Sequence, residues 1–469
     1  MPPRRARRPL SEYAGLSHWL ETSGDDLTPR AALEGTREAD VAILGAGFTG
    51  LWTALYLLRR DPSLRVAVLE REVAGFGASG RNGGWCIGLF PLSAERLERR
   101  FGREATRELL LAMIDTVDEV GRAVAAEGIE CDFRKGGVLR VARGPEQLAA
   151  LESSYAQYER LGLAERYRLL DPVELESYAR VTRAVRGLFS PDSAVLHPGR
   201  LVRGLARAVE RQGATVYEQT EVTGFVPGSS PRLLTPRGEV RARVLVLAGE
   251  AYLSGMPGLR RQVLPVYSQI ALTEPLSASK WEEIGWTGDH TISSMRLSVD
   301  YLARTPDGRL LFGSRGSSYR YGSRIDGASD RDPAIDRKLR GMVAEWFSAL
   351  RGTSFSHGWG GPIGVPRDWM PTVSYDAATG VASARGYTGR GVATANLAGR
   401  ILAGLITGEE SPLHRLALVG HRSPEWEPEP LRWLGVRFVQ RGLERADRRA
   451  ASTGQPPSGR SLAERLSSH

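Results

Sequence analysis

The apolar positions near the N-terminus fall into short runs with strand and helix periods. Residues 39–50 read ADVAILGAGFTG, an apolar run of strand length that ends in a glycine-rich turn. Residues 51–60 (LWTALYLLRR) have helical apolar spacing and stop before Asp61-Pro62, and residues 65–70 (RVAVLE) form a second strand-like run. A strand, a glycine turn, a helix and a second strand in about 30 residues predict a complete βαβ unit.

The rest of the chain alternates between the same two periods. Helical spacing covers 94–127, 201–212 and 392–406, whereas 214–218 and 240–248 have the composition of single strands. Several β-like runs lie between 262 and 313, and residues 386–391 form a further glycine-rich turn. At 469 residues the chain is too long for one ordinary domain, so we expect an α/β protein of two domains with tails.

Composition and charge exclude several classes of function. No apolar run approaches the roughly 18 residues of a membrane span, so we expect a cytoplasmic protein with no membrane partner. The net charge of +9 comes from arginines spread along the whole chain, with only three lysines, so we expect no nucleic-acid partner. The N-terminal sequence MPPRRARRPL lacks the apolar segment of a signal peptide and is interpreted as a short basic arm. Cys86 and Cys131 have no metal-ligand spacing, so we expect buried thiols and no metal site.

The first glycine-rich turn has the features of a dinucleotide site. Gly45 permits a tight turn out of the strand, Gly47 lets the backbone approach a pyrophosphate, and Gly50 lets the helix pack closely on the sheet. Glu70 ends the second strand 20 residues after Gly50, where an acid accepts hydrogen bonds from ribose hydroxyls. Because strand, turn, helix, strand and acid occur in order, the motif predicts a bound dinucleotide rather than a structural turn.

A second glycine-rich segment narrows the choice of cofactor. Residues 75–85 read GFGASGRNGGW, with five glycines in 11 residues. Such a segment offers many backbone N–H groups and little packing, which suits a loop that lies along an extended polar ligand.

With these motifs the sequence resembles the FAD-dependent amine and D-amino-acid oxidase family. The resemblance looks closest to the branch that contains gamma-glutamylputrescine oxidoreductases and the sarcosine or glycine oxidases. It covers roughly residues 36–410 and includes LHPGRLVRGLA at 196–206, WGGPIG at 359–364 and GYTGRGVATANLAGRILAGLI at 386–406. The resemblance implies a FAD-binding Rossmann-type domain from 36–110, 195–262 and 360–412, and a discontinuous substrate domain of mixed or antiparallel sheet plus helices from 111–194 and 263–359. The remainder is then an N-terminal arm (1–35) and a C-terminal helix with a disordered tail (413–469).

The resemblance also implies cofactor contacts by position. The ADP half of FAD would be held by Gly45, Ala46, Gly47, Phe48, Thr49, Gly50, Glu70 and Arg71, with Val222 at the adenine and Ala248 and Gly249 at the pyrophosphate. The ribityl chain and flavin ring would be met by Ser79, Arg81, Asn82, Gly83 and Gly84, and by Gly389, Gly391, Val392 and Ala393. Some relatives attach FAD to a cysteine or histidine. Trp85-Cys86 follows the loop here, and attachment to Cys86 is an alternative to the non-covalent FAD that we expect.

The activity implied is oxidation of the C–N bond of a small primary or secondary amine. Hydride passes to flavin N5, the imine is hydrolysed, and the electrons reach dioxygen, giving hydrogen peroxide, or another acceptor. Sarcosine-type relatives grip the substrate carboxylate with a lysine where this chain has Ala393, which weakens the case for a simple α-amino acid. Arg390 is the candidate for an anionic group of the substrate, with a solvent-facing side chain as the alternative.

Two aromatic residues complete the predicted catalytic set. Tyr267 and Trp359 could contribute to a box around a cationic amine, with ordinary core packing as the alternative for each. A flavin-dependent monooxygenase and a non-catalytic FAD-binding module remain the alternative functions. The sequence leaves open the substrate, the choice between oxidase and dehydrogenase, and the oligomeric state.

Overall fold

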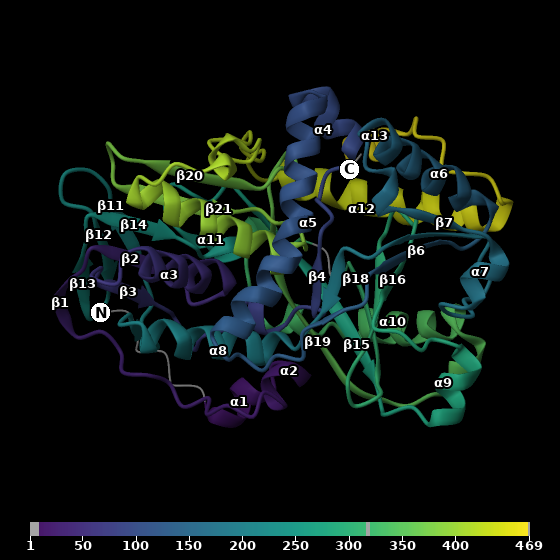
Figure 1. The fold of residues 1–469 in the computed structure, drawn as a ribbon, viewed down its shortest axis with the longest axis horizontal. Coiled ribbons are helices and arrows are strands. Elements are labelled where there is room, and N and C mark those ends of the chain that lie inside the picture. The colour runs from purple at the N-terminus through teal and green to yellow at the C-terminus, as the bar shows by residue number, and fades with distance from the viewer. Residues whose placement is uncertain (1–8, 316–318, 468–469) are drawn as a thin grey trace.

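A computed structural model describes residues 9–315 and 319–467, so the basic residues 1–8 of the predicted arm and the last two residues of the predicted tail lie outside the described part. Two modules lie side by side (Figure 1), each built on its own large sheet. The α/β fold class expected from the sequence is confirmed.

The first module contains a six-stranded sheet that is parallel except at one edge. Its order is β10 (Thr215–Tyr217), β3 (Val66–Leu69), β2 (Val41–Leu44), β14 (Val244–Leu247), β21 (Val381–Arg385) and β20 (Thr372–Asp376), with only β20 antiparallel to its neighbour. Val41 and Ile43 pack into the core beneath the helices, whereas Ala42 faces a separate cluster on the other side. Successive residues of a strand point to opposite faces of its sheet, and here both sets are apolar. Both faces of this sheet are therefore covered by other elements.

Helices cover one face of this sheet, and a small mixed sheet, in which β1 and β13 pair in parallel, covers the other. The helical layer consists of α3 (Phe48–Arg60), α8 (Pro198–Arg211) and α11 (Gly391–Thr407). The small sheet has the order β1 (Gly35–Glu38), β13 (Gly238–Arg241), β12 (Arg232–Thr235) and β11 (Gly224–Val226). The single strand predicted over 240–248 is therefore wrong: the chain leaves β13 at Arg241 and enters the large sheet at Val244, where the N–H groups of Arg243 and Val244 donate to the Asp40 carbonyl.

The second module is an eight-stranded, mainly antiparallel sheet with helices on one face. Its order is β19 (Phe355–Val365), β15 (Leu264–Thr273), β18 (Leu310–Arg315), β17 (Asp300–Arg304), β16 (Thr291–Ser294), β6 (Val138–Ala142), β8 (Arg186–Ser190) and β7 (Arg168–Leu170). Leu139, Ile292 and Phe312 on this face share a core with Trp346 of α10 (Pro333–Trp346) and Trp281 of α9 (Ala278–Ile284).

The remaining elements join the two modules or extend from them. A three-stranded sheet, β4 (Trp85–Ile87), β9 (Ser193–Val195) and β5 (Arg134–Lys135), lies at the junction, together with α4 (Ala94–Phe101) and the long α5 (Arg103–Ala126), which packs on α11 (Figure 1). The other helices are α1 (Leu10–Ala14), α2 (His18–Glu21), α6 (Pro145–Arg160), α7 (Pro172–Glu176), α12 (Leu431–Thr453) and α13 (Leu462–Ser467).

One strand crosses an expected domain boundary, and one helix lies in the expected disordered tail. β19 runs without a break across the expected boundary at 360, and its residues up to Val365 pair with β15 of the second sheet. The expected disordered tail instead contains α13, which packs on α12 so closely that a Cβ at Gly442 would lie 2.2 Å from the Ala463 Cβ. No helix in the described ranges is long and apolar enough to cross a bilayer.

Candidate cofactor and active site

A cavity of about 420 Å³ opens where the parallel strands of the six-stranded sheet end. The turn after β2, the end of β3 and the turn after β14 meet at this edge, because all three strands run in the same direction. The carboxyl edge of an open parallel sheet is the usual place for a ligand. The cavity continues past residues 220–223 at one end and reaches β19 and the start of α11 at the other, so it is an elongated channel rather than a round pocket.

The first glycine turn has the close approaches that its motif predicts. Gly45 has a φ of 102°, and a Cβ there would lie 2.8 Å from the Ala248 carbonyl oxygen. A Cβ at Gly50 would lie 2.0 Å from the Gly45 carbonyl oxygen, so only glycine lets α3 begin so close to the turn. Gly47, the residue before α3, lines the cavity and has no side chain that could cap the helix. The N–H groups at the start of α3 therefore face the channel at the glycine turn.

Glu70 lies at the end of β3 and closes the turn from the opposite side. Its carboxylate accepts the backbone N–H of Ala46 at 2.9 Å and that of Glu72 at 3.1 Å. Burial raises the pKa of Glu70, and the two backbone donors oppose that shift. The acid therefore fixes the glycine turn and also lines the cavity.

The second glycine-rich segment crosses from the channel into the other module. Ser79 Oγ accepts the Phe48 N–H at 2.8 Å, and Asn82 Oδ1 accepts the Gly84 N–H at 2.8 Å. Arg81 points away from the channel: its buried guanidinium contacts Asp330 Oδ2 at 2.8 Å and the Tyr252 hydroxyl at 2.8 Å. The loop thus lies along the cavity with its backbone while Arg81 anchors it to the second module.

The third glycine turn places the start of α11 at the far end of the channel. Gly389 has a φ of 86°, and Gly391 begins a 17-residue helix that has no side-chain N-cap. Both glycines line the cavity, so the first N–H groups of α11 and their partial positive charge face the ligand space.

Glu250 is a half-buried acid at the same end that the sequence analysis did not single out. Its carboxylate accepts the N–H of Gly386 at 3.0 Å and of Tyr387 at 2.9 Å, and so ties the turn before α11 to the segment after β14. Burial raises the pKa of Glu250 to about 7. The only signal in the sequence was an acid directly after the Ala248-Gly249 pair, and its contacts are with residues 136 and 137 positions away.

Most of the predicted cofactor residues line one cavity, and the others do not line it. The lining includes Gly45, Gly47, Phe48, Thr49, Glu70, Arg71, Ser79, Asn82, Val222, Ala248, Gly249, Gly389, Gly391 and Val392. The predicted cofactor residues that do not line the cavity are Ala46, Gly50, Arg81, Gly83, Gly84 and Ala393. The Arg81 guanidinium instead contacts Asp330 of the other module.

Two of the predicted catalytic residues, Tyr267 and Trp359, are buried on the neighbouring strands β15 and β19. The Tyr267 hydroxyl donates to the Asp326 carbonyl at 3.4 Å and accepts the Asp326 N–H at 3.1 Å. Trp359 is buried, and its Nε1 donates to the Arg81 carbonyl at 2.9 Å. Their polar groups are therefore occupied by the backbone, and a catalytic role for either remains a prediction.

Arg390, the third predicted catalytic residue, lies at a helix start rather than on a strand. It lies between Gly389 and Gly391 at the N-cap of α11 and is half-buried, and no carboxylate among the described residues pairs with it. Desolvation and, to a lesser extent, the nearby charge of Arg140 lower the pKa of Arg390 to about 10. Arg140, on β6, has its guanidinium 5.6 Å from the centre of the Tyr158 ring and a buried Nη2 without a partner in the described chain. The sequence analysis missed Arg140, because nothing local distinguishes it from a surface arginine.

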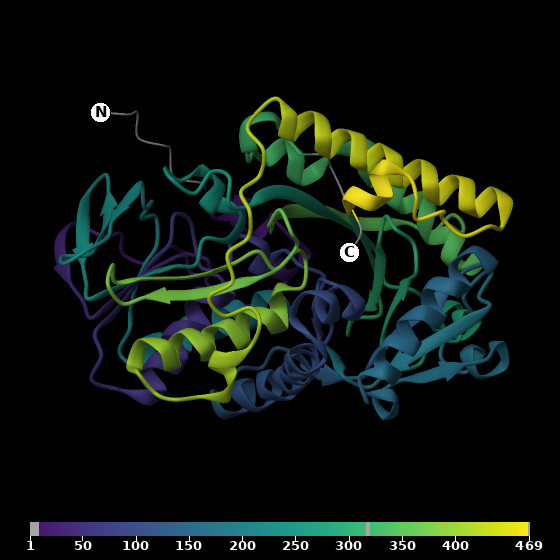
Figure 2. The ribbon, with the colours of Figure 1, turned by 90° about the horizontal axis from the view of Figure 1, so that it is seen from above.

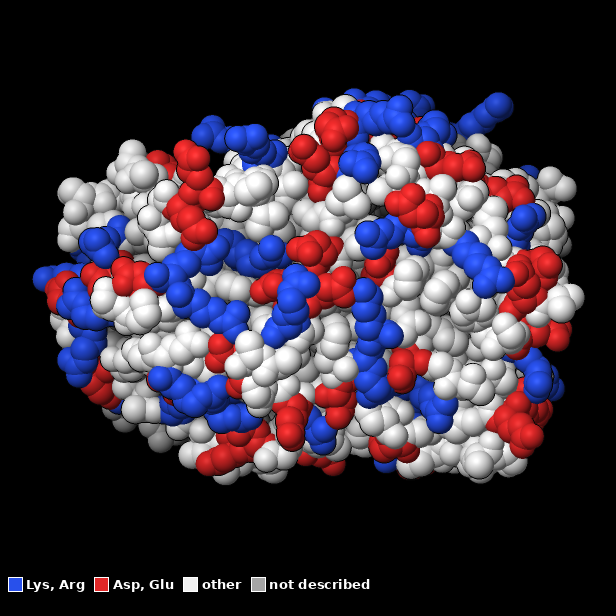
Figure 3. All heavy atoms as spheres, in the orientation of Figure 1, with Lys and Arg blue, Asp and Glu red and all other residues white. Residues whose placement is uncertain are grey.

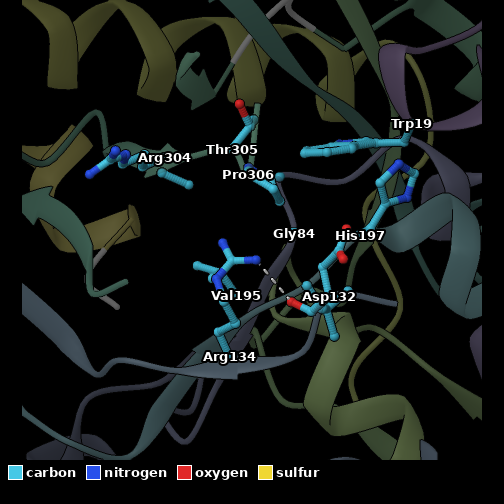
Figure 4. Close-up of a pocket in the computed structure, with 12 residues that line it drawn as sticks. Trp19, Gly84, Asp132, Arg134, Val195, His197, Arg304, Thr305 and Pro306 are labelled. Atoms are coloured by element: carbon cyan, nitrogen blue, oxygen red, sulfur yellow. Dashed lines mark hydrogen bonds between the residues drawn. The ribbon is translucent and has the colours of Figure 1, made fainter. Parts of the chain in front are cut away.

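A second, much smaller pocket lies on the other side of the glycine-rich loop (Figure 4). It has room for about 10 Å³ and is lined by Trp19, Gly83, Gly84, Asp132 and His197 among others. His197 is committed to structure, since Nδ1 accepts the Arg200 N–H at 3.1 Å and Nε2 contacts the Thr22 hydroxyl at 3.1 Å. A space of this size admits about one water molecule, so it is no substrate site.

Comparison with known proteins identifies the class of cofactor. The family model described as FAD dependent oxidoreductase (DAO) matches residues 40–405. Gamma-glutamylputrescine oxidoreductase of Escherichia coli (strain K12) is 29% identical over 407 residues, covering 86% of this chain and 92% of that protein. Probable oxidoreductase OrdL of Haemophilus influenzae is 31% identical over 382 residues, covering 80% and 84%. Glycine oxidase from Geobacillus kaustophilus has the same fold, with a TM-score of 0.68 at 20% identity over 82% of this chain and 99% of that one.

Proposed function

The chain belongs to the DAO family of FAD-dependent oxidoreductases, and from that premise we propose that it oxidises the C–N bond of a small amine that carries an anionic group. FAD is its cofactor, as expected from the sequence. The observation that supports the anionic group is the pair Arg140 and Arg390, two neighbouring arginines that form no ion pair with a carboxylate of the described residues. Neither lines the cavity, but Gly389 and Gly391 on both sides of Arg390 do.

The residues along the channel fit an extended dinucleotide. Gly45 and Gly47 leave the space that side chains would fill, and the N-termini of α3 and α11 face the two ends of the cavity. In this proposal Val222 meets the adenine, Gly249 lies against the pyrophosphate, and the N–H groups of Val392 and Ala393 face the pyrimidine edge of the ring. A helix N-terminus there stabilises negative charge on a reduced flavin.

We propose that FAD is bound non-covalently. Cys86, the nearest thiol to the loop, is fully buried, and burial raises its pKa above the usual range. A buried, protonated thiol is a poor nucleophile, so attachment to Cys86 is disfavoured.

The chain's own residues bind and orient the substrate. Bound FAD supplies the hydride acceptor. Arg140 and Arg390 hold the anionic end of the substrate, and two guanidinium groups without a protein carboxylate favour a carboxylate or phosphonate over a neutral end. Tyr301 packs against the glycine loop, where a Cβ at Gly83 would lie 2.5 Å from its ring, and its hydroxyl contacts Ser268 Oγ at 3.1 Å. This ring limits the space over the loop and contributes to excluding water.

The location and the electron acceptor complete the proposal. We propose a cytoplasmic enzyme that passes its electrons to dioxygen or to another acceptor. The proposal is tested by absorbance of the purified holoprotein under argon, with a panel of polyamines, acylated polyamines, N-methyl amino acids, D-amino acids and aminophosphonates. We expect the flavin bands to bleach with an amine that carries an anionic group, and readmission of air to show whether dioxygen restores them.

The arginine pair is tested with Arg390→Gln and Arg140→Gln on the amine that bleaches the flavin. Each substitution should raise KM by about tenfold or more while the flavin spectrum is retained, because a charge-assisted contact is lost in both the ground and the transition state. On an analogue that lacks the anionic group, each variant should match the wild type.

The matched control is Arg103→Gln at the exposed start of α5, which should leave KM unchanged. Equal losses on both substrates would contradict an anion site and indicate general disruption of the cavity. A flavin that no amine reduces would indicate another electron donor or a protein that only binds FAD. Bleaching only with NADPH plus an aromatic compound would indicate a flavin-dependent monooxygenase.

A further inference from the structure

The C-terminal helices form a fixed surface on the second module, outside the region matched by the family. That match ends at residue 405, whereas α12 begins at Leu431. One face of α12 is buried through Val436, Leu443 and Ala450. Figure 2 shows the helix lying along the outer edge of the molecule, so its opposite face is directed outward.

Polar contacts fix α12 at several points along its length. The Asp447 carboxylate accepts the N–H groups of Leu297 at 3.0 Å and Ser298 at 2.9 Å. Glu429 accepts the Trp433 N–H at 3.1 Å just after the start of the helix, and Lys338 of α10 pairs with Glu444 at 3.1 Å. The outward face is therefore a defined surface and not a frayed tail.

The outward face of α12 begins with large apolar side chains. Leu431, Leu434 and Phe438 are 61%, 52% and 51% exposed, and their i, i+3, i+7 spacing places them in one stripe. On the adjoining α13, Leu462 and Leu466 are 58% and 44% exposed. These two short segments thus contain five of the eight large hydrophobic side chains that are exposed in the described chain, which is more clustering than scattered surface residues would give.

The same stripe continues as a row of arginines. Arg441, Arg445 and Arg449 follow Phe438 at helical spacing and are exposed, and Arg448 is exposed beside them. None of these four forms an ion pair with an acid of the described residues, and the two acids of the helix, Glu444 and Asp447, are engaged elsewhere. Residues 431–453 contain six arginines and two acids. On the face of the molecule drawn in Figure 3, by contrast, basic and acidic side chains are interspersed.

An anionic lipid bilayer fits this combination best. Leucine and phenylalanine side chains on a surface helix enter the boundary between headgroups and acyl chains, while long arginine side chains reach the lipid phosphates. A second copy of the chain fits less well, because a twofold contact on this stripe would set the apolar half of one helix against the arginine row of the other, or arginines against arginines. The stripe is also too short and too charged to enter the bilayer fully.

In place of the absence of a membrane partner expected from the sequence, we propose that the outward stripe of α12, with α13, docks the enzyme on the surface of a membrane that contains anionic phospholipids. The helix lies on the bilayer without crossing it. The inference is independent of the substrate proposed above, because it uses no residue of the cofactor channel.

The test is flotation of the full-length holoprotein with vesicles, read by flavin absorbance in the floated fraction. Vesicles of phosphatidylcholine mixed with phosphatidylglycerol in equal parts should carry the protein, and vesicles of phosphatidylcholine alone should not. Leu434→Ser with Phe438→Ser should reduce the bound fraction about tenfold, because apolar burial at the interface is lost. Arg441→Gln with Arg445→Gln should reduce it by a similar factor and remove its dependence on salt.

The control is Val173→Ser on α7, which removes an apolar side chain that is 80% exposed and far in sequence from the stripe. It should bind vesicles as the wild type does, and all variants should keep their flavin spectrum. Equal binding to neutral vesicles, no binding to anionic ones, or unchanged binding by both double variants would overturn the proposal. Light scattering that shows a dimer which Leu434→Ser with Phe438→Ser converts to a monomer would assign the stripe to self-association instead.

Discussion

At the scale of single residues, Glu250 has a structural role, and its negative charge would repel the phosphates of the cofactor. Its half-buried carboxylate organises the turn at Gly386 and Tyr387, yet it lines the cavity beside Gly249, where a dinucleotide pyrophosphate is proposed to lie. Desolvation raises the pKa of this carboxyl from 4.5 to about 7, and the two backbone N–H donors oppose the shift without cancelling it. The group therefore changes charge near neutral pH.

The sign of the pH dependence follows from this raised pKa. The folded protein binds the Glu250 proton more tightly than the unfolded chain does, so this contribution to stability is complete below about pH 4.5 and is lost as the pH rises through about 7. A negative pyrophosphate disfavours the carboxylate further. We expect the dissociation constant of FAD to increase by up to about tenfold per pH unit above the pKa in the wild type, and to stay flat in Glu250→Gln.

Fluorescence titration of the apoprotein with FAD, at about pH 6 and about pH 8, measures this difference. The glutamine keeps an acceptor oxygen for the two N–H groups, so the turn is retained while the titration is removed. The control is Glu410→Gln, at an exposed acid that forms no ion pair with another described residue, and it should follow the wild type. A variant at Glu250 with the wild-type pH slope would assign the titrating charge to another group.

At the scale of elements, the βαβ unit depends on how closely α3 approaches the turn after β2. A Cβ at Gly50 would lie 2.0 Å from the Gly45 carbonyl oxygen and 3.1 Å from Ile43 Cγ2, so Gly50→Ala must push the helix away from the sheet. We expect a loss of about 2–4 kcal/mol in the free energy of unfolding and purification of the variant without flavin. Thermal unfolding and the ratio of flavin to protein absorbance measure the two effects.

The matched control for this prediction is another glycine inside a helix. Gly341 lies in α10 with nothing within 4 Å of its Cβ position, so Gly341→Ala should keep FAD and increase stability by up to about 1 kcal/mol. A Gly50→Ala variant that retains flavin and thermal stability would show that the turn can open without cost.

The elements that the sequence predicted well are those fixed by neighbours along the chain. Gly45, Gly50 and Glu70 are recognisable because the turn, the helix and the acid contact one another within one local unit. The family, the FAD cofactor and the fold class followed from such local motifs. The break at Ala242 that separates β13 from β14 was not visible, because an apolar run does not show which of two sheets each half will join.

Contacts between distant segments could not be predicted in the same way. Glu250 acts through Gly386 and Tyr387, and Arg140 becomes conspicuous only where β6 and the N-terminus of α11 meet. Neither the residue types nor their local patterns distinguish them from surface acids and arginines. The exposed stripe of α12 is also a tertiary property, since the same helical pattern would be expected if that face were covered.

At the scale of the whole molecule, the two modules are tied together through the glycine-rich loop. Arg81 leaves this loop and reaches Asp330, the Gly360 carbonyl at 3.2 Å and the Tyr252 hydroxyl, and its side chain is 1% exposed. Burial raises the pKa of Asp330 even with this partner present, because desolvation outweighs the attraction of the guanidinium. One side chain thus links the cofactor loop, the segment after β14 and the second sheet.

Loss of Arg81 should therefore affect both stability and the cofactor. In Arg81→Ala, Asp330 is left half-buried without its cation, and the Gly77 and Gly360 carbonyls and the Tyr252 hydroxyl lose a donor. We therefore expect a loss of about 3–5 kcal/mol in the free energy of unfolding. Because the loop is then no longer held against β19, FAD should also dissociate more readily, which gel filtration and flavin absorbance detect.

Asp330→Asn added to Arg81→Ala should restore part of the stability, since it removes the uncompensated acid. The exposed pair of Arg99 and Glu95, at 2.8 Å, provides the comparison: Arg99→Ala should change the free energy of unfolding by no more than about 1 kcal/mol and leave FAD bound. If both arginine variants lower the free energy of unfolding by the same small amount, apolar packing rather than the ion pair of Arg81 and Asp330 holds the modules together.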